Sequence, residues 1–342
     1  MSEFHVAVTR LEKINKHPNA DMLEITEVYG GYPCIIKAGT FNEGDLATYI
    51  PVDALVPAND KRFSFLGSSQ SVKVIDSKEF FRIKAIKLRG VFSMGLLVAP
   101  ERDWIDGQNV QAELGIEKYE PPIVFQGHNV NNQPTKEQHW MQCYTDIEGL
   151  RKHKNILEAG EEVVLNEKLH GSSSRFVYRD NELRVGSHYV FKHRHTENMW
   201  WRVAIEHKLE EKLGSQYQDI GLYGEVLGLV QDLRYGATQN NPLMLRIFDV
   251  IDTKTNRYWD YDDMKSLCEL LALPTVPEIY RGPWLGYDEM ICYADGQSLI
   301  HNANHMREGF VVRSVKERYE HKCGRVILKM IGTDYLLRKE KK

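Results

Sequence analysis

The 342-residue sequence predicts a mixed α+β protein with an all-β N-terminal domain and a larger C-terminal domain of strands and helices. Short apolar or alternating segments, divided by turn residues, fill the first hundred positions. Helical spacing occurs further along, beyond a polar, proline-containing segment. We therefore expect domains at 1–105 and 140–342, joined by a linker at 106–139.

Strands of the first domain are expected at 25–29, 34–37, 47–50, 82–88 and 95–98. Turn signals such as Gly30-Gly31 and Arg89-Gly90 separate them. About five short strands at this spacing favour a small Greek-key barrel of the OB type. In the second domain, 198–213 and 262–273 have the spacing of amphipathic helices.

Composition narrows the class of protein. The five cysteines are odd in number, widely scattered and without a C-x-x-C pair, which disfavours a disulfide framework or a zinc site. We find no secretory leader and no apolar run long enough to cross a bilayer, so we expect an intracellular, cytoplasmic protein with no membrane partner. The net charge of −4 argues against a chain coated in positive charge, but it leaves room for a local basic groove.

The most informative motif is Glu167-Lys168-Leu169-His170-Gly171-Ser172, which comes after the apolar run Val163-Val164-Leu165. A lysine at the end of a strand, followed by a glycine that admits close backbone approach, is the arrangement that a covalent lysyl-nucleotide needs. Lys168 is the candidate nucleophile. The same pattern also fits a plain strand and turn, so its weight depends on whether partner residues occur further along the chain.

Four short β-rich runs come later in the chain, and each carries one carboxylate, aromatic or lysine side chain that a sheet can project into a common cleft. In order, they contain Glu225, Phe248, Glu308 and Lys329. With the Lys168 motif they resemble motifs I, III, IIIa, IV and V of polynucleotide ligases and mRNA capping enzymes. The resemblance spans about 140–340 and implies a nucleotidyltransferase domain of ATP-grasp-like antiparallel sheets with flanking helices.

Domain order separates the branches of this superfamily. DNA ligases and capping enzymes place an OB domain after motif V, whereas this chain ends at Lys342, shortly after Lys329. An OB unit ahead of the catalytic domain, with Leu88-Arg89-Gly90-Val91-Phe92-Ser93 in it, resembles the Deinococcus and Naegleria type of nick-sealing RNA ligase, the fifth RNA ligase family. The resemblance implies a monomeric enzyme that seals 3′-OH/5′-phosphate nicks in duplex RNA or RNA/DNA hybrids through lysyl-AMP and RNA-adenylate.

Two other classes stay open. A DNA ligase or a capping-type guanylyltransferase is disfavoured by domain order. A non-catalytic RNA-binding protein is disfavoured because the four charged motif residues are intact: Lys168, Glu225, Glu308 and Lys329.

The resemblance also implies roles for single residues. Lys168 attacks the α-phosphate of ATP, and Lys329 contacts that phosphate. Mg²⁺ or Mn²⁺ is held by Glu225 and Glu308. The remaining nucleotide contacts are assigned to Glu167 at the adenine edge, Gly171 near phosphate, Glu225 at the ribose and Phe248 against the adenine ring. A core position is the alternative for Phe248.

Five residues are candidates for RNA contacts: Arg89, Arg151, Arg175, Ser187 and Lys192. For Ser187 a turn position is the alternative, and for Lys192 a solvated loop. Many relatives carry a second lysine two positions after the first in motif V, whereas this chain has Ile331. A second cation then comes from Lys322 or Arg325, or is absent.

Overall fold

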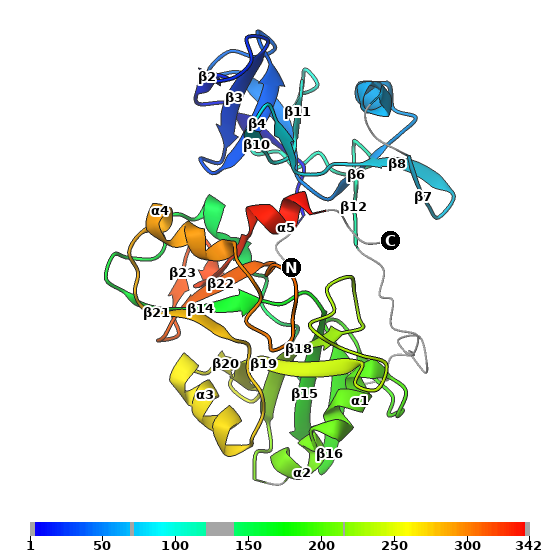
Figure 1. The fold of residues 1–342 in the computed structure, drawn as a ribbon, viewed down its shortest axis with the longest axis vertical. Helices are drawn as coiled ribbons and strands as arrows, with labels where there is room; N and C mark the ends of the chain where they lie inside the picture. The colour runs from blue at the N-terminus through cyan, green and yellow to red at the C-terminus, as the bar shows by residue number, and fades with distance from the viewer. Residues whose placement is uncertain (1–3, 69–71, 121–139, 215, 339–342) are drawn as a thin grey trace. The chain divides into compact units, whose positions relative to one another are not determined.

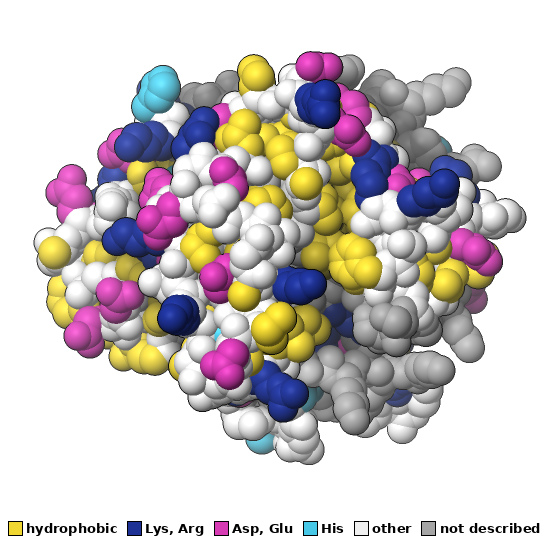
Figure 2. Space-filling view, turned by 90° about the horizontal axis from the view of Figure 1, so that it is seen from above, with side chains coloured by type: hydrophobic (Ala, Val, Ile, Leu, Met, Phe, Trp, Pro, Cys, Tyr) yellow, Lys and Arg dark blue, Asp and Glu magenta, His cyan; other side chains and the backbone are white. Residues whose placement is uncertain are grey.

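The computed structural model describes residues 4–68, 72–120, 140–214 and 216–338. The chain divides into two compact units, Met1–Pro121 and Pro122–Lys342, and each is described by itself. Figure 1 labels their helices and strands. On the face drawn in Figure 2, acidic and basic side chains are intermixed rather than gathered by sign.

The first unit is built from short antiparallel strands, whose sheets have the orders β1-β5-β11, β2-β3-β4, β10-β9 and β12-β6-β8-β7. Its elements are β1 (Ala7–Arg10), β2 (Ile14–Lys16), β3 (Leu23–Val28), β4 (Tyr32–Lys37), β5 (Leu46–Ile50), β6 (Ala54–Pro57), the 3-10 helix η1 (Lys61–Ser68), β7 (Lys73–Ile75), β8 (Lys78–Arg82), β9 (Ile86–Leu88), β10 (Val91–Ser93), β11 (Leu96–Val98) and β12 (Glu117–Lys118).

Residues 106–120, which were expected to belong to the linker, are part of this first unit. Val110, Leu114 and Ile116 are buried in the same core as Val56 and Phe81, and β12 pairs with β6. Burial of this apolar stretch accounts for the difference, because a solvated linker would leave those side chains in water. Residues 121–139 lie outside the described residues.

The second unit contains two main sheets. One has the order β17-β16-β15-β18-β19-β20 and the other β13-β25-β22-β14-β21; all pairings are antiparallel except that of β13 with β25. The strands are β13 (Glu148–Gly149), β14 (Glu162–Lys168), β15 (Ser172–Arg179), β16 (Glu182–Ser187), β17 (Phe191–Lys192), β18 (Ile220–Gly228), β19 (Leu243–Asp252), β20 (Arg257–Tyr258), β21 (Glu278–Pro283), β22 (Gly309–Ser314), β23 (Tyr319–Glu320), β24 (Gly324–Arg325) and β25 (Ile327–Ile331).

Helices complete the second unit, and three of them pack on the six-stranded sheet: Trp200 of α1, Leu209 of α2 and Met264 of α3 share a core with Phe176 and Leu222. The helices are α1 (Met199–Glu206), α2 (Leu209–Leu213), α3 (Tyr261–Leu270), α4 (Tyr287–Met290) and α5 (Thr333–Leu337), with 3-10 turns η3 (Leu150–Lys152) and η4 (Ile291–Ala294). None of the helices in the described ranges is long and apolar enough to cross a membrane.

The single helix expected over 198–213 is wrong, because the structure has two. Lys208 adopts a left-handed conformation, with φ of 53°, and separates α1 from α2. Such a residue stops the helical hydrogen-bond pattern. The start was predicted well: the Asn198 side chain accepts hydrogen bonds from the backbone N–H groups of Trp200 and Trp201, as a helix N-cap does.

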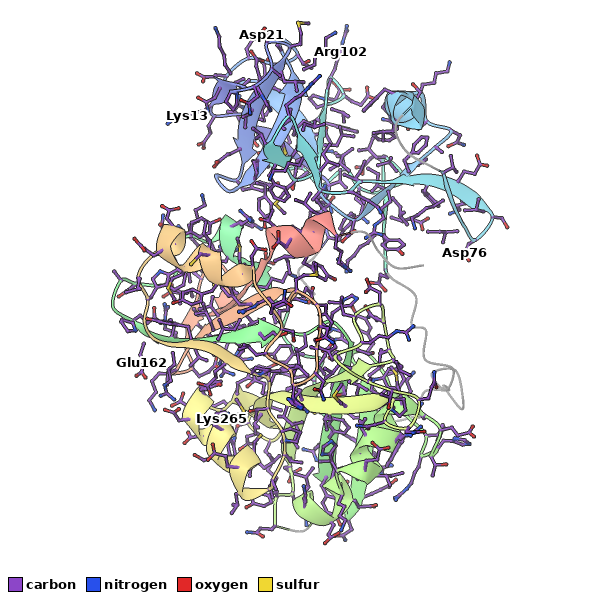
Figure 3. The ribbon with its side chains drawn as sticks, viewed as in Figure 1. Lys13, Asp21, Asp76, Arg102, Glu162 and Lys265 are labelled. Atoms are coloured by element: carbon purple, nitrogen blue, oxygen red, sulfur yellow. The ribbon has the colours of Figure 1, made fainter. Side chains whose placement is uncertain are left out.

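Strand β14 links the two sheets. It begins at Glu162, labelled in Figure 3, and ends at Lys168. Val163 lies in the core of the five-stranded sheet, whereas Val164 lies in the core of the six-stranded sheet. Side chains alternate along a strand, so Lys168 is on the same face as Val164 and is directed toward the other sheet.

Candidate active site

Lys168 forms an ion pair with Glu308 at the end of β14. Its Nζ donates a hydrogen bond to Oε1 of Glu308 across 2.6 Å. Glu308 directly precedes β22, and its neighbour Gly309 is paired in register with Lys168. The lysine side chain is 25% exposed and the glutamate side chain 9%. Two adjacent strands therefore hold the pair in a site that is mostly shielded but open to a ligand.

Gly171 lies in the turn that joins β14 of one sheet to β15 of the other. A Cβ at this position would lie 2.2 Å from the carbonyl oxygen of Val226 and 3.1 Å from Cγ of Glu225. The Gly171 carbonyl in turn accepts a hydrogen bond from Nε2 of Gln231 at 2.6 Å. Only glycine fits this contact, and the close approach brings β18, with Glu225, next to the Lys168 turn.

Glu225 is a partly buried carboxyl on β18. Burial, together with the negative charge of Glu308, raises its pKa to about 8, although Lys168 acts in the opposite direction. In the protein without a bound cation, this shift favours the protonated form of Glu225. Additional positive charge nearby would favour its ionised form.

The two carboxyls fit the donor set of a hard divalent cation. Oε2 of Glu308 is buried and accepts no hydrogen bond from the described residues. Oxygen donors suit Mg²⁺ and Mn²⁺. No group of three or more His, Cys, Asp or Glu side chains that could hold a metal occurs in the described parts of the chain. Oxygen atoms of a phosphate group or of water would suit such a cation as further ligands.

Glu167 is directed away from Lys168 and is 2% exposed. Its Oε2 accepts a hydrogen bond from the backbone N–H of Leu299 at 2.7 Å. Burial raises the pKa of this carboxyl. The side chain anchors the loop around Leu299 to β14, and the backbone N–H of Glu167 donates to the Pro277 carbonyl at 2.8 Å, so both of these groups are engaged within the domain.

Lys329 lies on the same sheet face as Lys168. Asn166 of β14 is in register with Val311 of β22, and Val311 with Lys329 of β25. Residues in one row share a face, and Asn166 and Lys168 are two positions apart on β14. The structure therefore places both lysines on the face that is directed toward the six-stranded sheet.

The second motif V cation is not supplied by Arg325. That side chain is buried, and its Nη1 lies 2.6 Å from Oδ2 of Asp249 while its Nη2 lies 2.7 Å from Oε2 of Glu317. These two carboxylates engage its guanidinium in the core. Lys322 is exposed, and Ile331 packs at the edge of a hydrophobic cluster.

Phe248 lies at a β-bulge. Tyr223 pairs with Asp249 and the next residue of β18, Gly224, pairs with Ile247, which leaves Phe248 as the extra residue of β19. Its ring is partly buried and touches two hydrophobic clusters, one around Tyr144 and one around Leu169. The packed part of the ring agrees with the core position considered for Phe248. Its exposed part agrees with the adenine-stacking position, which stays a prediction.

No role was predicted for His170 from the sequence, yet this residue of the turn contacts several distant residues. Its Nε2 lies 2.8 Å from Oδ1 of Asp232, and its Nδ1 lies 3.0 Å from the hydroxyl of Tyr335 and 3.9 Å from Oε2 of Glu308. Its backbone N–H donates to the hydroxyl of Tyr235 at 2.7 Å. These partners lie far along the chain, so no local sequence pattern pointed to them.

Arg175 is buried, 1% exposed, and is engaged in the core. Its Nε donates to the Ser187 carbonyl and its Nη1 to the Met141 carbonyl, at 2.9 and 2.7 Å. Burial leaves it no surface for an RNA strand, so the RNA contact expected for it is not supported. Ser187 closes the turn before β17, since its backbone N–H donates to the Val190 carbonyl at 2.9 Å, which agrees with the turn alternative.

The other RNA candidates have different surroundings. Lys192 is 6% exposed, its ammonium lies 5.3 Å from the ring centre of Trp200, and burial lowers its pKa. Arg151 donates from Nη1 to the hydroxyl of Tyr287 at 3.3 Å. Arg89 is an exposed residue of the turn between β9 and β10 in the first unit. The solvated alternative for Lys192 is wrong, because its side chain is covered.

Comparison with known proteins identifies the family. A model of the RNA ligase family matches residues 161–331, which is half of the chain and contains the two lysines and the two carboxylates described above. The chain belongs to the RNA ligase family. An OB-fold domain model also matches residues 5–100 of the ligase, which confirms the barrel expected there.

Solved structures agree with this assignment over nearly the whole ligase. A variant of Naegleria gruberi RNA ligase with ATP and Mn is 24% identical, with a TM-score of 0.81 over 97% of this chain and 98% of that chain. A second variant with ATP and Mn is 25% identical, with a TM-score of 0.78 over 97% of both chains. A third, with AMP and Mn, is 24% identical, with a TM-score of 0.82 over 98% of both. Comparison with curated proteins gives no match. The α+β fold and the resemblance to the Naegleria type of RNA ligase are confirmed.

Proposed function

We propose that this RNA ligase uses ATP and a divalent metal ion to seal 3′-OH/5′-phosphate nicks through lysyl-AMP and RNA-adenylate. The observation that supports this most is the contact between Lys168 and Glu308, across 2.6 Å, with Glu225 on the neighbouring strand β18, which the turn at Gly171 contacts. The Naegleria gruberi ligase variants solved with ATP, AMP and Mn support the choice of nucleotide and metal.

In the first step, the neutral Nζ of Lys168 attacks the α-phosphorus of ATP. A nitrogen–phosphorus bond forms, the bond from the α-phosphorus to its bridging oxygen breaks, and pyrophosphate leaves with the electron pair. Glu308 Oε1 accepts the proton that Nζ loses, because it is already hydrogen-bonded to that nitrogen.

In the second step, a 5′-phosphate oxygen of RNA attacks the AMP phosphorus. The nitrogen–phosphorus bond breaks with its electron pair on nitrogen, and Lys168 takes a proton back from Glu308. In the third step, the 3′-hydroxyl attacks the activated 5′-phosphate and gives up its proton to water, and AMP leaves with the electron pair of the broken bond. Lys329, on the same sheet face as Lys168, offers a fixed positive charge to the phosphate in each step.

Glu225 and Glu308 would hold the metal ion. When bound, Mg²⁺ or Mn²⁺ neutralises developing charge on phosphate oxygens. Oε2 of Glu308 is buried and accepts no hydrogen bond from the described residues, and the pKa of Glu225 is raised. Both features fit a bound cation, because it would add positive charge next to each carboxyl. The adenine would stack on Phe248, and the backbone of Glu167 would meet its edge.

For the substrate, we propose nicked duplex RNA or an RNA/DNA hybrid, held in part by the OB domain, with the ligase acting as a monomer. OB folds bind nucleic acid on a strand face and loops. Arg89 and the exposed Lys84 and Lys87 offer positive charge on this domain. The five cysteines are free thiols, which fits a reducing compartment and supports the expected cytoplasmic location.

The deciding experiment is incubation of the protein with α-labelled ATP or GTP and Mg²⁺ or Mn²⁺, followed by denaturing electrophoresis. We expect label from ATP on the wild type and none on Lys168→Ala. Lys316→Ala is the matched control, because Lys316 is 79% exposed and is paired with Asp260. Label from GTP alone would indicate a guanylyltransferase, and no label from either nucleotide would indicate a non-catalytic RNA-binding protein.

A further inference from the structure

Tyr144 lies ahead of residues 161–331, the part that the RNA ligase model matches, and its ring packs against Phe248. The ring centroids are 4.9 Å apart and the planes meet at 68°, an edge contact of the kind that aromatic pairs prefer. Tyr144 is 8% exposed. A residue outside the matched region therefore contacts Phe248 beside the candidate nucleotide site.

Tyr144 is itself fixed by hydrogen bonds. Its hydroxyl donates to Oδ2 of Asp249 at 2.7 Å and accepts from Nη1 of Arg325 at 3.2 Å. Asp249 is the residue directly after Phe248 on β19, and it is fully buried. One carboxylate thus sets the position of the Tyr144 ring and also fixes the backbone beside Phe248.

The Asp249 carboxylate is fully engaged. Its other oxygen accepts hydrogen bonds from Nη1 of Arg313 and from the backbone N–H of Val250, both at 3.0 Å. Burial acts to raise the pKa of Asp249, but Arg313 and Arg325 outweigh it and the pKa lies below its usual value. A buried carboxylate with this many charged partners cannot shift without leaving a charge unpaired, so it forms a rigid support.

Phe248 needs such a support. As the extra residue of a bulge it has no direct partner across the β18 ladder, and its ring is partly exposed. An edge contact with Tyr144 covers at most one of the two ring faces. Tyr144 thus supports the ring from one side, and the exposed part of the ring is left for a flat ligand.

We propose that Tyr144 is a positioning residue for the nucleotide, because it holds the Phe248 ring in the orientation in which its exposed part meets the adenine. This inference rests on the proposed role of Phe248. A ring that is held in place before binding loses less conformational freedom when the base arrives, so the effect belongs to nucleotide affinity rather than to the chemical step.

The test is the kinetics of lysine adenylylation by the full chain with ATP and Mn²⁺. For Tyr144→Leu we expect KM for ATP to rise roughly 3- to 10-fold, which is the change in binding that the loss of one aromatic pair produces. The value of kcat should stay within about twofold. Tyr144→Phe keeps the ring but loses the hydroxyl contacts that fix it, so its KM should lie between those of the wild type and Tyr144→Leu. The matched control is Trp140→Leu, since Trp140 lies in the same cluster, is 9% exposed and has Phe191 as its ring partner.

Three further measurements separate the possible failures. If Tyr144→Leu does not fold, Tyr144→Met provides the same comparison with an unbranched side chain that adapts to an irregular space. The double variant of Tyr144→Leu with Phe248→Leu should show the KM of Phe248→Leu alone. Once the Phe248 ring is gone, Tyr144 has no ring to position. If Phe248→Leu raises KM while Tyr144→Leu behaves like Trp140→Leu, the inference is overturned; if Phe248→Leu leaves KM unchanged, the proposed stacking itself fails.

Discussion

The carbonyl oxygen of Val226 lies where a side chain at Gly171 would begin, since a Cβ there would come within 2.2 Å of it. This contact joins the turn after Lys168 to β18, the strand that carries Glu225. The distance between Lys168 on one sheet and Glu225 on the other thus depends on residue 171 having no Cβ atom.

Gly171→Ala should reduce lysine adenylylation by roughly 100-fold or more, because β18 or the turn must move and displace Glu225 from Lys168. The rate is measured with labelled ATP in a single turnover. Gly67→Ala serves as the control, since a Cβ there would meet only Cζ of Phe81 at an ordinary 3.5 Å. Normal rates for Gly171→Ala would mean that the close contact has no bearing on the chemistry.

Glu225→Ala and Glu308→Ala should each reduce nick sealing by at least roughly 100-fold in Mg²⁺, since both remove charge that holds the cation at the reacting phosphate. Partial recovery is expected at high Mn²⁺. Glu320→Ala is the control, because Glu320 is 46% exposed and pairs with Arg318. Near-normal sealing by Glu225→Ala or Glu308→Ala would assign that carboxylate a structural role only.

Glu225 also predicts a pH dependence of stability in the absence of metal. Its pKa is raised from 4.5 to about 8 in the folded protein, so between these values the folded state holds a proton that the unfolded state has released. The free energy of unfolding should therefore fall as pH rises through this window. Urea denaturation in EDTA at pH 5 and pH 8 tests it, and Glu225→Gln should show a weaker decline; parallel curves for the two proteins would contradict the shift.

Asp232 should matter through His170. Burial acts to raise the pKa of Asp232, but the contact with His170 and the charge of Arg338 outweigh it and hold the pKa well below its usual range. Its contribution to stability is therefore present above the usual carboxyl pKa and is lost as pH falls below it. Asp232→Asn should lower the free energy of unfolding by about 1–3 kcal/mol at pH 7. A loss that stays the same size at pH 3 would count against the ionic origin of the effect.

The sugar at the nick should decide sealing. We expect the ligase to require ribonucleotides on the 3′-OH side, where the 2′-hydroxyl and the A-form shape are sensed, and to accept DNA on the 5′-phosphate side. Sealing rates on matched nicks measure this, and binding should weaken as salt rises. Deletion of residues 1–121 should spare part of lysine adenylylation and strongly impair sealing. Equal rates on ribose and deoxyribose ends, with full sealing by the truncated protein, would favour a DNA ligase.

The sequence predicted the parts of the site that depend on strand ends. Lys168 and Glu308 were expected in one cleft, and the structure joins them across 2.6 Å. Their runs are short and apolar and each carries one polar residue, so strand formation alone brings that residue to a sheet edge. The roles of these residues stay predictions, while the OB fold and the ligase family are confirmed.

Local sequence patterns did not predict three other features of the structure. Arg175 lies on β15, where Phe176 and Val177 are both fully buried, so the strand is covered on both faces and alternation does not tell inside from outside. The contact of His170 with Tyr335 joins residues 165 positions apart. The break at Lys208 arises from one left-handed residue with no glycine to signal it.

The buried carboxylate of Asp249 has a consequence for how the domain is made. Its partners Arg313 and Arg325 are synthesised well after it, Arg313 by 64 residues. Until both have emerged from the ribosome, enclosing this negative charge costs more than the surrounding core returns. The domain thus cannot close around this carboxylate until Arg325 has been synthesised, and a chain cut short before Arg325 should be recognised by proteases as unfolded rather than persist as an inactive ligase.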